Sequence, residues 1–260
     1  MPTNFTATAN GYNPHNAHVL AQISKSTRGG STPAGFELVR DPIECAGTTV
    51  HVLASPEAVI IAFRGTDSAY DWLVTDAWTD LESFTDFPFD YRRVHRGFRN
   101  ALGAVANKID DALKDPKATG KPRWITGHSL GGALAVLLAA RQTLLQGHAV
   151  QGVYTFGQPR VGNWSFVRAI RKALDTRYFR ILRVGDPTPH LPSVLRYRDC
   201  GTPFLLTQEG KLYRELSFGD RLKDGITTAK VFMNAPGVDI EKFHALTTYI
   251  DALSKYPVPA

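Results

Sequence analysis

The sequence predicts an α/β fold, in which a central, mainly parallel β-sheet is covered by helices on both faces. Residues 58–63 form a run that is apolar on both strand faces, which is typical of a strand buried between two layers of helices. From residue 124 to residue 184, extended and helical patterns alternate at short intervals, as strands joined by crossover helices do. The interior contains no Gly/Ser-rich linker and no charge block, so residues 1–260 are expected to form one domain.

The first half of the chain is predicted to enter the sheet through antiparallel strands. Apolar residues at helical spacing predict a short helix over residues 14–24. Extended runs follow at 36–40, 48–54 and 58–63, with a tight Ser-Pro-Glu connection before the third. A helix is predicted over 98–113, closed by an Asp-Pro pair.

The second half supplies the strand-helix alternation. The predicted strands lie at 124–126, 150–156 and 177–184, and the predicted helices at 130–146 and 164–174. A β-hairpin is predicted over 204–216, and a C-terminal helix is predicted to begin at His244.

The stretch Gly-His-Ser-Leu-Gly-Gly at residues 127–132 lies between a predicted strand and a predicted helix. A serine in this setting, with glycine two positions to either side, is typical of the nucleophile elbow of an α/β hydrolase. The sharp turn exposes the hydroxyl of Ser129, and side chains at the flanking positions would collide with the neighbouring strand and helix. The following helix directs its N-terminal N–H groups to the place where an oxyanion would form. We therefore expect Ser129 to be the nucleophile and the Leu130 amide to be an oxyanion donor.

A serine hydroxyl needs an adjacent base and a third group that orients the base. In α/β hydrolases the chain order is serine, acid, histidine. Asp186 directly follows a strand-like run and lies in a loop with three prolines, so it is the expected acid. His244 follows the last sheet elements and is the expected base, with His190 as the reserve. Three other downstream acids and one histidine lack this context: Asp175, Asp199, Asp220 and His148.

Thr66 follows the buried strand predicted at 58–63, within a polar Arg-Gly-Thr-Asp tip. Functional groups of α/β folds commonly lie at such strand ends. With the serine elbow present, we expect the Thr66 backbone N–H and hydroxyl to form the other half of the oxyanion hole. The alternative is that Thr66 only caps a following helix.

Residues 67–90 form a segment of unusual composition, with seven acidic residues, no lysine or arginine, and many aromatic residues. Apolar residues recur within it at helical spacing and define one stripe. The segment is either a surface helix packed on the domain or a lid that covers an apolar substrate cleft. The stripe comprises Tyr70, Leu73, Val74, Ala77, Trp78 and Leu81.

Charge and cysteine content exclude several classes of protein. The formal net charge is +6, but the basic residues are scattered without a nucleic-acid motif, so no nucleic-acid partner is expected. No apolar run has membrane-spanning length, and the N-terminus lacks the regions of a signal peptide. We therefore expect a cytoplasmic protein, or one exported without a leader or with its leader trimmed.

Cys45 and Cys200 could pair, but they are too few for a disulfide scaffold or a zinc site, and no cofactor or metal is expected.

With these residues in view, the chain resembles the class 3 lipase family, which includes the filamentous-fungal triacylglycerol lipases. The resemblance implies an α/β-hydrolase fold and places the nucleophile, acid and base on Ser129, Asp186 and His244. It also places the oxyanion hole on Thr66 and Leu130 and a lid on residues 67–90. The motifs that carry the resemblance are Phe-Arg-Gly-Thr (63–66), Asp-Trp (71–72), Val-His-Arg-Gly-Phe (94–98), the elbow from residue 127 to 135, the stretch 155–163, Asp-Pro-Thr-Pro-His-Leu-Pro (186–192) and the late histidine.

The expected activity is the hydrolysis of carboxylic esters through an acyl-enzyme, with a neutral acylglycerol at a lipid–water interface as the expected substrate. The alternatives on the same scaffold are a soluble short-chain carboxylesterase, a phospholipase and an esterase of plant-wall aromatic acids of the feruloyl type. A more distant alternative is a non-catalytic lipid-binding protein.

Overall fold

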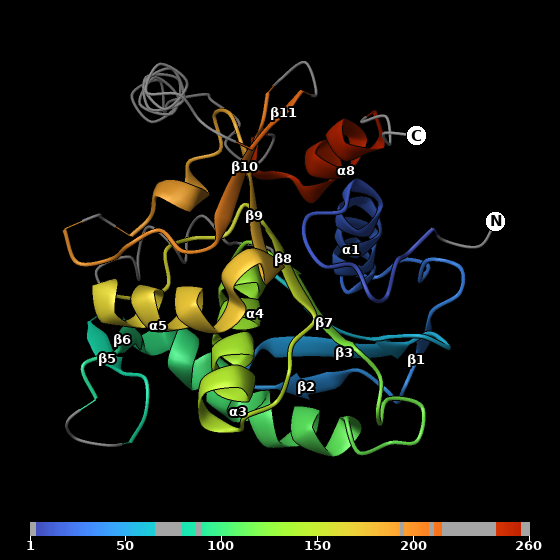
Figure 1. Cartoon of the computed structure of the whole chain (residues 1–260), viewed down its shortest axis with the longest axis horizontal. Coiled ribbons are helices and arrows are strands. Elements are labelled where there is room, and N and C mark those ends of the chain that lie inside the picture. Colours follow the sequence, from blue (N-terminus) through green and yellow to red (C-terminus); the bar gives the residue numbers. More distant parts are fainter. Residues whose placement is uncertain are drawn as a thin grey trace.

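The computed structural model describes residues 4–65, 80–86, 90–192, 195–207, 211–214 and 243–255. The strands of its large sheet are β1 (Glu37–Leu38), β2 (Ile43–Cys45), β3 (Thr48–Ala54), β4 (Val59–Phe63), β7 (Arg123–His128), β8 (Gly152–Phe156), β9 (Tyr178–Arg183), β10 (Thr202–Leu206) and β11 (Leu212–Tyr213). Within the described ranges they lie in the order β1, β3, β4, β7, β8, β9, β10, β11, and β2 pairs with β3 (Figure 1). The five strands from β4 to β10 run parallel, which confirms the predicted fold class.

Helices cover both faces of this sheet. One face carries α1 (Pro14–Ser26) and α8 (Leu246–Ser254), which contact each other, and the other carries α3 (Arg96–Ala112), α4 (Leu130–Ala140) and α5 (Trp164–Leu174) (Figure 1). Each layer has its own apolar core against the strands. All residues of β4 and β8 are buried, because a central strand between two helical layers has no face exposed to water.

The register of the parallel strands brings four loops to one edge of the sheet. Phe63 at the end of β4 is level with Gly127 of β7, and His128 at the end of β7 is level with Phe156 of β8. Phe156 in turn is level with Ile181 of β9. The connections that follow β4, β7, β8 and β9 therefore leave from neighbouring points, which is where α/β folds place their ligand and catalytic groups.

The helices agree with the sequence patterns, with one correction. Asn163 caps α5 by accepting a hydrogen bond from the Phe166 N–H, and the helix spans the predicted residues. Helix α4 is apolar on all sides, and all of its residues are buried. The prediction of one continuous helix over 130–146 is wrong, because α4 ends at Ala140 and a single π-helical turn, η1 (Arg141–Leu145), follows.

Several short strands differ from the prediction. β2 was not predicted, and β5 (Leu81–Ser83) pairs with β6 (Arg93–His95) in a separate two-stranded sheet. Leu81 therefore lies in a strand and not in the predicted helical stripe. The predicted hairpin is present as β10 and β11, and β10 also pairs with β9. The unpredicted strands β2, β5 and β6 have three residues each, too few for an alternating pattern to show.

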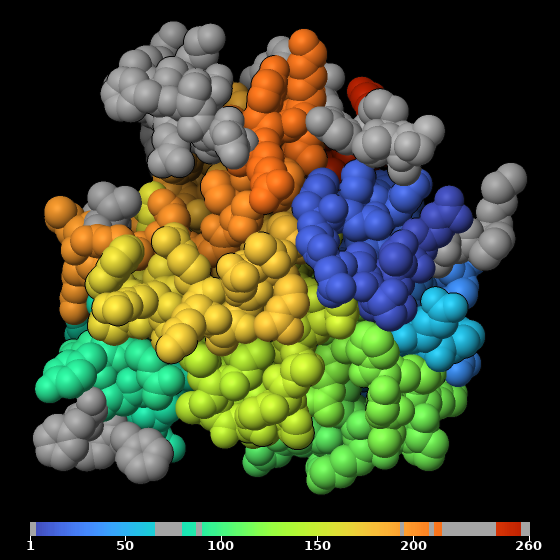
Figure 2. Space-filling view, viewed as in Figure 1, coloured from blue at the N-terminus to red at the C-terminus, as the bar shows by residue number. Residues whose placement is uncertain are grey.

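The N-terminal segment is fixed to the sheet by polar and aromatic contacts. The indole N–H of Trp124 donates to the Ala7 carbonyl over 3.1 Å, and Tyr12 stacks on Phe204 of β10 with ring centroids 3.9 Å apart. Figure 2 shows this blue segment lying beside the orange β10 and β11 region. Among the described residues, no helix combines the length and apolar character needed to cross a membrane.

Candidate active site

Ser129 lies at the turn from β7 into α4. Its backbone has φ 57° and ψ −127°, which is a strained conformation for a residue with a side chain. Two backbone hydrogen bonds of 2.9 Å hold the turn: the Ser129 N–H donates to the Phe156 carbonyl, and the Gly132 N–H donates to the Ser129 carbonyl. The strain persists because the neighbouring strand and helix both fix the turn.

The glycines around Ser129 are required by close approach of the backbone. A Cβ on Gly127 would lie 2.2 Å from the Gly131 carbonyl oxygen, and a Cβ on Gly131 would lie 2.4 Å from the Phe63 carbonyl oxygen. Both contacts are with backbone atoms of packed elements, which cannot move aside. The collision predicted from the sequence is therefore present at both positions.

Asp186 and His244 form a buried pair. Asp186 follows β9 and is fully buried, and its Oδ2 lies 2.8 Å from Nδ1 of His244, just before α8. The other oxygen, Oδ1, accepts a 2.9 Å hydrogen bond from the Thr188 N–H. Since a carboxylate oxygen accepts, the imidazole proton lies on Nδ1, and Nε2 is left available as a base.

The Tyr249 hydroxyl donates a 2.6 Å hydrogen bond to the same Asp186 oxygen. Tyr249 is on α8, and its ring is fully buried. The sequence pattern assigned Tyr249 to the apolar stripe of the C-terminal helix, and periodicity alone does not indicate a polar contact at the hydroxyl end of a tyrosine. This is a site residue that the sequence did not identify.

His128 connects the elbow to the histidine of the pair. Its Nε2 lies 2.7 Å from the His244 carbonyl oxygen, and the ring centroids of His128 and His244 are 4.4 Å apart. Because a carbonyl can only accept, Nε2 carries the proton. Burial lowers the pKa of His128 well below 6.5, and His244 and Arg28 lower it further. His128 is therefore a neutral hydrogen-bond donor that immediately precedes Ser129.

Ser129 Oγ and His244 Nε2 are among the buried polar atoms that have no hydrogen-bond partner within the described residues. Gly157, with φ 54° at the end of β8, keeps the space beside the pair open. A Cβ there would lie 2.8 Å from Asp186 Oδ2 and 3.0 Å from His244 Cε1. Buried polar atoms normally have partners, so these two are candidates for reacting groups.

The remaining predicted positions are distributed as follows. Leu130 is the first residue of α4, where a backbone N–H has no intrahelical acceptor. Thr66 and Asp220 lie outside the described residues, as does most of the predicted lid, 67–90. His190 lies in the 3₁₀ turn η3 (Thr188–His190), beyond Asp186. Asp199 pairs with two arginines.

No cluster of three or more histidine, cysteine, aspartate or glutamate side chains suited to a metal ion occurs in the described parts of the chain. Cys45 and Cys200 are both free thiols, and Cys200 is buried.

A parallel sheet with a strained serine between a central strand and its helix, and a buried aspartate–histidine pair after later strands, defines an α/β hydrolase. The family model for lipase (class 3) matches residues 60–195, more than half of the chain. The chain belongs to the class 3 lipase family.

Relatives of known sequence agree with this assignment. The chain is 36% identical over 155 residues to Lipase ZK262.3 of Caenorhabditis elegans, covering 58% of this chain and 42% of that protein. It is 29% identical over 195 residues to secreted mono- and diacylglycerol lipase 1 of Fusarium solani, covering 70% and 54%. The chain thus spans about half, or less, of the length of these relatives.

Solved structures show the same fold. The triacylglyceride lipase of Rhizomucor miehei matches with a TM-score of 0.67 at 20% identity, over 89% of this chain and 94% of that one. Lipase II from Rhizopus niveus matches with a TM-score of 0.65 at 21% identity, over 74% and 80%.

Proposed function

We propose that this chain hydrolyses the ester bonds of acylglycerols through an acyl-enzyme, with Ser129, His244 and Asp186 as its triad. The observation that carries the proposal is the buried 2.8 Å contact between Asp186 and His244, adjoining a strained elbow that presents Ser129. Family membership supports it, as does a structural neighbour, a triacylglycerol lipase described as having a serine protease triad as its catalytic centre.

In the first half of the reaction, His244 Nε2 removes the Ser129 hydroxyl proton as Oγ attacks the ester carbonyl carbon. The carbonyl oxygen takes the negative charge and is stabilised by the Leu130 N–H and by Thr66. The intermediate then collapses, the bond to the alkoxy oxygen breaks, and His244 gives its proton to the leaving alcohol. Asp186 keeps the imidazole in the Nδ1–H form and stabilises its cation.

In the second half, water replaces the alcohol. His244 takes a proton from the water, the hydroxide attacks the acyl carbon, and the same two donors stabilise the second oxyanion. Breaking the bond to Ser129 Oγ releases the carboxylic acid, and His244 returns the proton to the serine. The free enzyme is restored without a cofactor.

The serine assignment is tested by Ser129→Ala, with the exposed Ser31→Ala as the matched control. A fluorophosphonate probe should label the wild type and Ser31→Ala on Ser129 and should not label Ser129→Ala. Hydrolysis of p-nitrophenyl esters by Ser129→Ala should fall by about six orders of magnitude, as the loss of a triad serine does elsewhere. Substantial activity in Ser129→Ala, or no covalent adduct in the wild type, would refute the proposal; the latter would favour a lipid-binding protein.

The substrate class is tested by comparing rates on triacylglycerol, phospholipid, feruloyl and short-chain soluble esters. We propose acylglycerols as the preferred substrate and residues 67–90 as a lid. A rate on triacylglycerol that rises steeply as the substrate exceeds its solubility would support both. A preference for one of the other esters, or a hyperbolic dependence without that rise, would assign the chain to the corresponding esterase or phospholipase.

A further inference from the structure

The loop that carries Asp186 has more hydrogen-bond acceptors than donors. Pro187, Pro189 and Pro192 have no backbone N–H, and the Thr188 N–H is used by Asp186 Oδ1. Buried carbonyl groups without partners cost free energy, so this loop needs donors from elsewhere in the chain.

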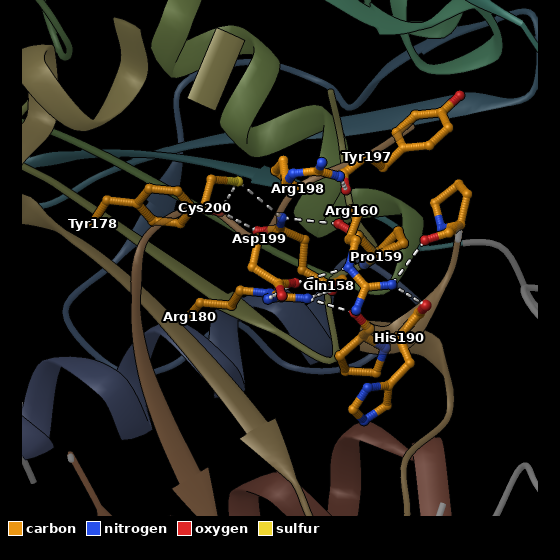
Figure 3. Close-up of polar contacts among 12 residues, drawn as sticks. Gln158, Pro159, Arg160, Tyr178, Arg180, His190, Tyr197, Arg198, Asp199 and Cys200 are labelled. Atoms are coloured by element: carbon orange, nitrogen blue, oxygen red, sulfur yellow. Dashed lines mark hydrogen bonds and ion pairs between the residues drawn. The ribbon is translucent and has the colours of Figure 1, made fainter. Parts of the chain in front are cut away.

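Two arginine side chains supply those donors. Arg160 Nη1 donates to the carbonyls of His190 and Pro192, the latter over 2.8 Å, and the Arg160 backbone N–H donates to the Leu191 carbonyl over 2.7 Å. Arg180 Nη2 donates to the Pro189 carbonyl over 2.7 Å. Figure 3 shows the Arg160 side chain directed at this loop from the segment after β8.

Asp199 holds the two guanidinium groups together. Its Oδ1 accepts from Arg160 Nε over 3.0 Å and from Arg180 Nη1 over 2.7 Å (Figure 3). The arginine side chains are only 7% and 4% exposed, whereas Asp199 is 58% exposed. Burying a guanidinium costs free energy unless it is paired with an opposite charge. The Asp199 carboxylate, at the protein surface, pairs with both arginines and so allows both to be buried beside the loop.

Thr188 connects this hydrogen-bonded loop to Asp186, the proposed catalytic acid. Thr188 lies between two of the prolines, and its N–H orients Asp186 Oδ1. We propose that Arg160, Arg180 and Asp199 form a clamp of positioning residues, which fixes the loop of residues 186–192 and thereby aims Asp186 at His244. The inference rests on the proposed function for its catalytic consequence, whereas the effect on the loop is independent of catalysis.

Arg180→Lys tests the clamp, because lysine keeps the charge but lacks the fork that reaches Asp199 and Pro189 together. Arg177→Lys is the matched control, since Arg177 also donates to backbone carbonyls, those of Leu174, Val150 and Ala173, but donates to none in the loop. Asp199→Asn is a second variant at an exposed side chain, in case Arg180→Lys fails to fold.

The first readout is amide hydrogen exchange at Thr188, measured by NMR in the 260-residue chain. Exchange should accelerate by at least about tenfold in Arg180→Lys and Asp199→Asn, relative to the wild type and Arg177→Lys. Equal rates in Arg180→Lys and Arg177→Lys would overturn the clamp, whether or not the protein hydrolyses esters.

The second readout is the kinetics on a p-nitrophenyl ester. A misaimed Asp186 should lower kcat by about 10- to 100-fold while KM stays within about twofold, because positioning acts on the reacting groups and not on substrate binding. An unchanged kcat in Arg180→Lys and Asp199→Asn, with accelerated Thr188 exchange, would overturn the positioning role. Absence of hydrolysis in the wild type would instead refute the proposed function and leave the exchange comparison to decide the clamp.

Discussion

The Tyr249 hydroxyl and His244 Nδ1 share one acceptor, Asp186 Oδ2, at 2.6 and 2.8 Å. With the Thr188 N–H on Oδ1, the buried carboxylate is held by three donors from two regions of the chain. Three donors restrict rotation of the carboxylate, so they favour the orientation in which Oδ2 of Asp186 faces His244.

Removing the Tyr249 hydroxyl should therefore affect both stability and rate. For Tyr249→Phe we expect the free energy of unfolding to fall by about 1.5 kcal/mol and kcat/KM to fall by about tenfold, since a hydrogen bond to a buried charged group is lost. Urea unfolding and ester kinetics measure the two effects. Tyr213→Phe, at a tyrosine that is 41% exposed, should change neither, and identical behaviour of the two variants would contradict the role of the hydroxyl.

Gly157→Ala and Gly147→Ala separate backbone strain from crowding of the site. Both glycines have positive φ, 54° and 67°, so alanine should cost each about 1–2 kcal/mol of stability. Only Gly157→Ala would place a Cβ against Asp186 and His244, whereas the space around Gly147 is open. We expect Gly147→Ala to keep its activity and Gly157→Ala to lose about 100-fold or more. Equal activities of the two variants would show that Asp186 and His244 tolerate the added Cβ at residue 157.

His128 should make stability depend on pH. Its pKa in the folded protein lies well below 6.5, so below about pH 6.5 the unfolded chain binds a proton that the folded protein does not. The free energy of unfolding should then decrease as the pH falls, by up to about 1.4 kcal/mol per pH unit. Urea unfolding between about pH 5 and 8 should show this slope reduced in His128→Gln. The exposed His148→Gln should keep the wild-type curve, and parallel curves for all three proteins would exclude His128 as the cause.

Asp199 should stabilise the folded protein at neutral pH, and this stabilisation should be lost at acid pH. Although the Asp199 side chain is 58% exposed, partial desolvation of its carboxylate against the protein raises its pKa. The charges and hydrogen bonds of Arg180 and Arg160 outweigh this effect and lower the pKa of Asp199 below 3.8. Its contribution to stability is complete above the unfolded pKa and is lost as the pH falls through the folded one. Asp199→Asn should unfold at lower urea concentration than wild type near about pH 6, and the difference should vanish near about pH 2. A difference that stays constant over this range would mean that the charge on Asp199 is not responsible.

Much of the fold and of the candidate site could be predicted because the signals are local. Burial of residues 58–63 on both faces follows from their side chains alone, and the elbow follows from collisions within a few residues of Ser129. Asp186 stood out because it directly follows a strand and lies among prolines. Strands of two or three residues, and the end of α4 at Ala140, lacked such signals and were missed or misplaced.

The sequence by itself determined the chemical type of each group in the candidate site and the order of serine, aspartate and histidine along the chain. Only the tertiary structure decided that Tyr249, 63 residues beyond Asp186, donates to Asp186. It also decided that Arg160 and Arg180, joined by Asp199, donate to the carbonyls of the Asp186 loop. In the sequence Tyr249 belongs to an apolar stripe, Arg160 to the loop after a strand, Arg180 to the interior of a strand, and Asp199 to a turn. Their contacts arise because strand register and helix packing bring distant positions within hydrogen-bond distance, and no local pattern records that distance.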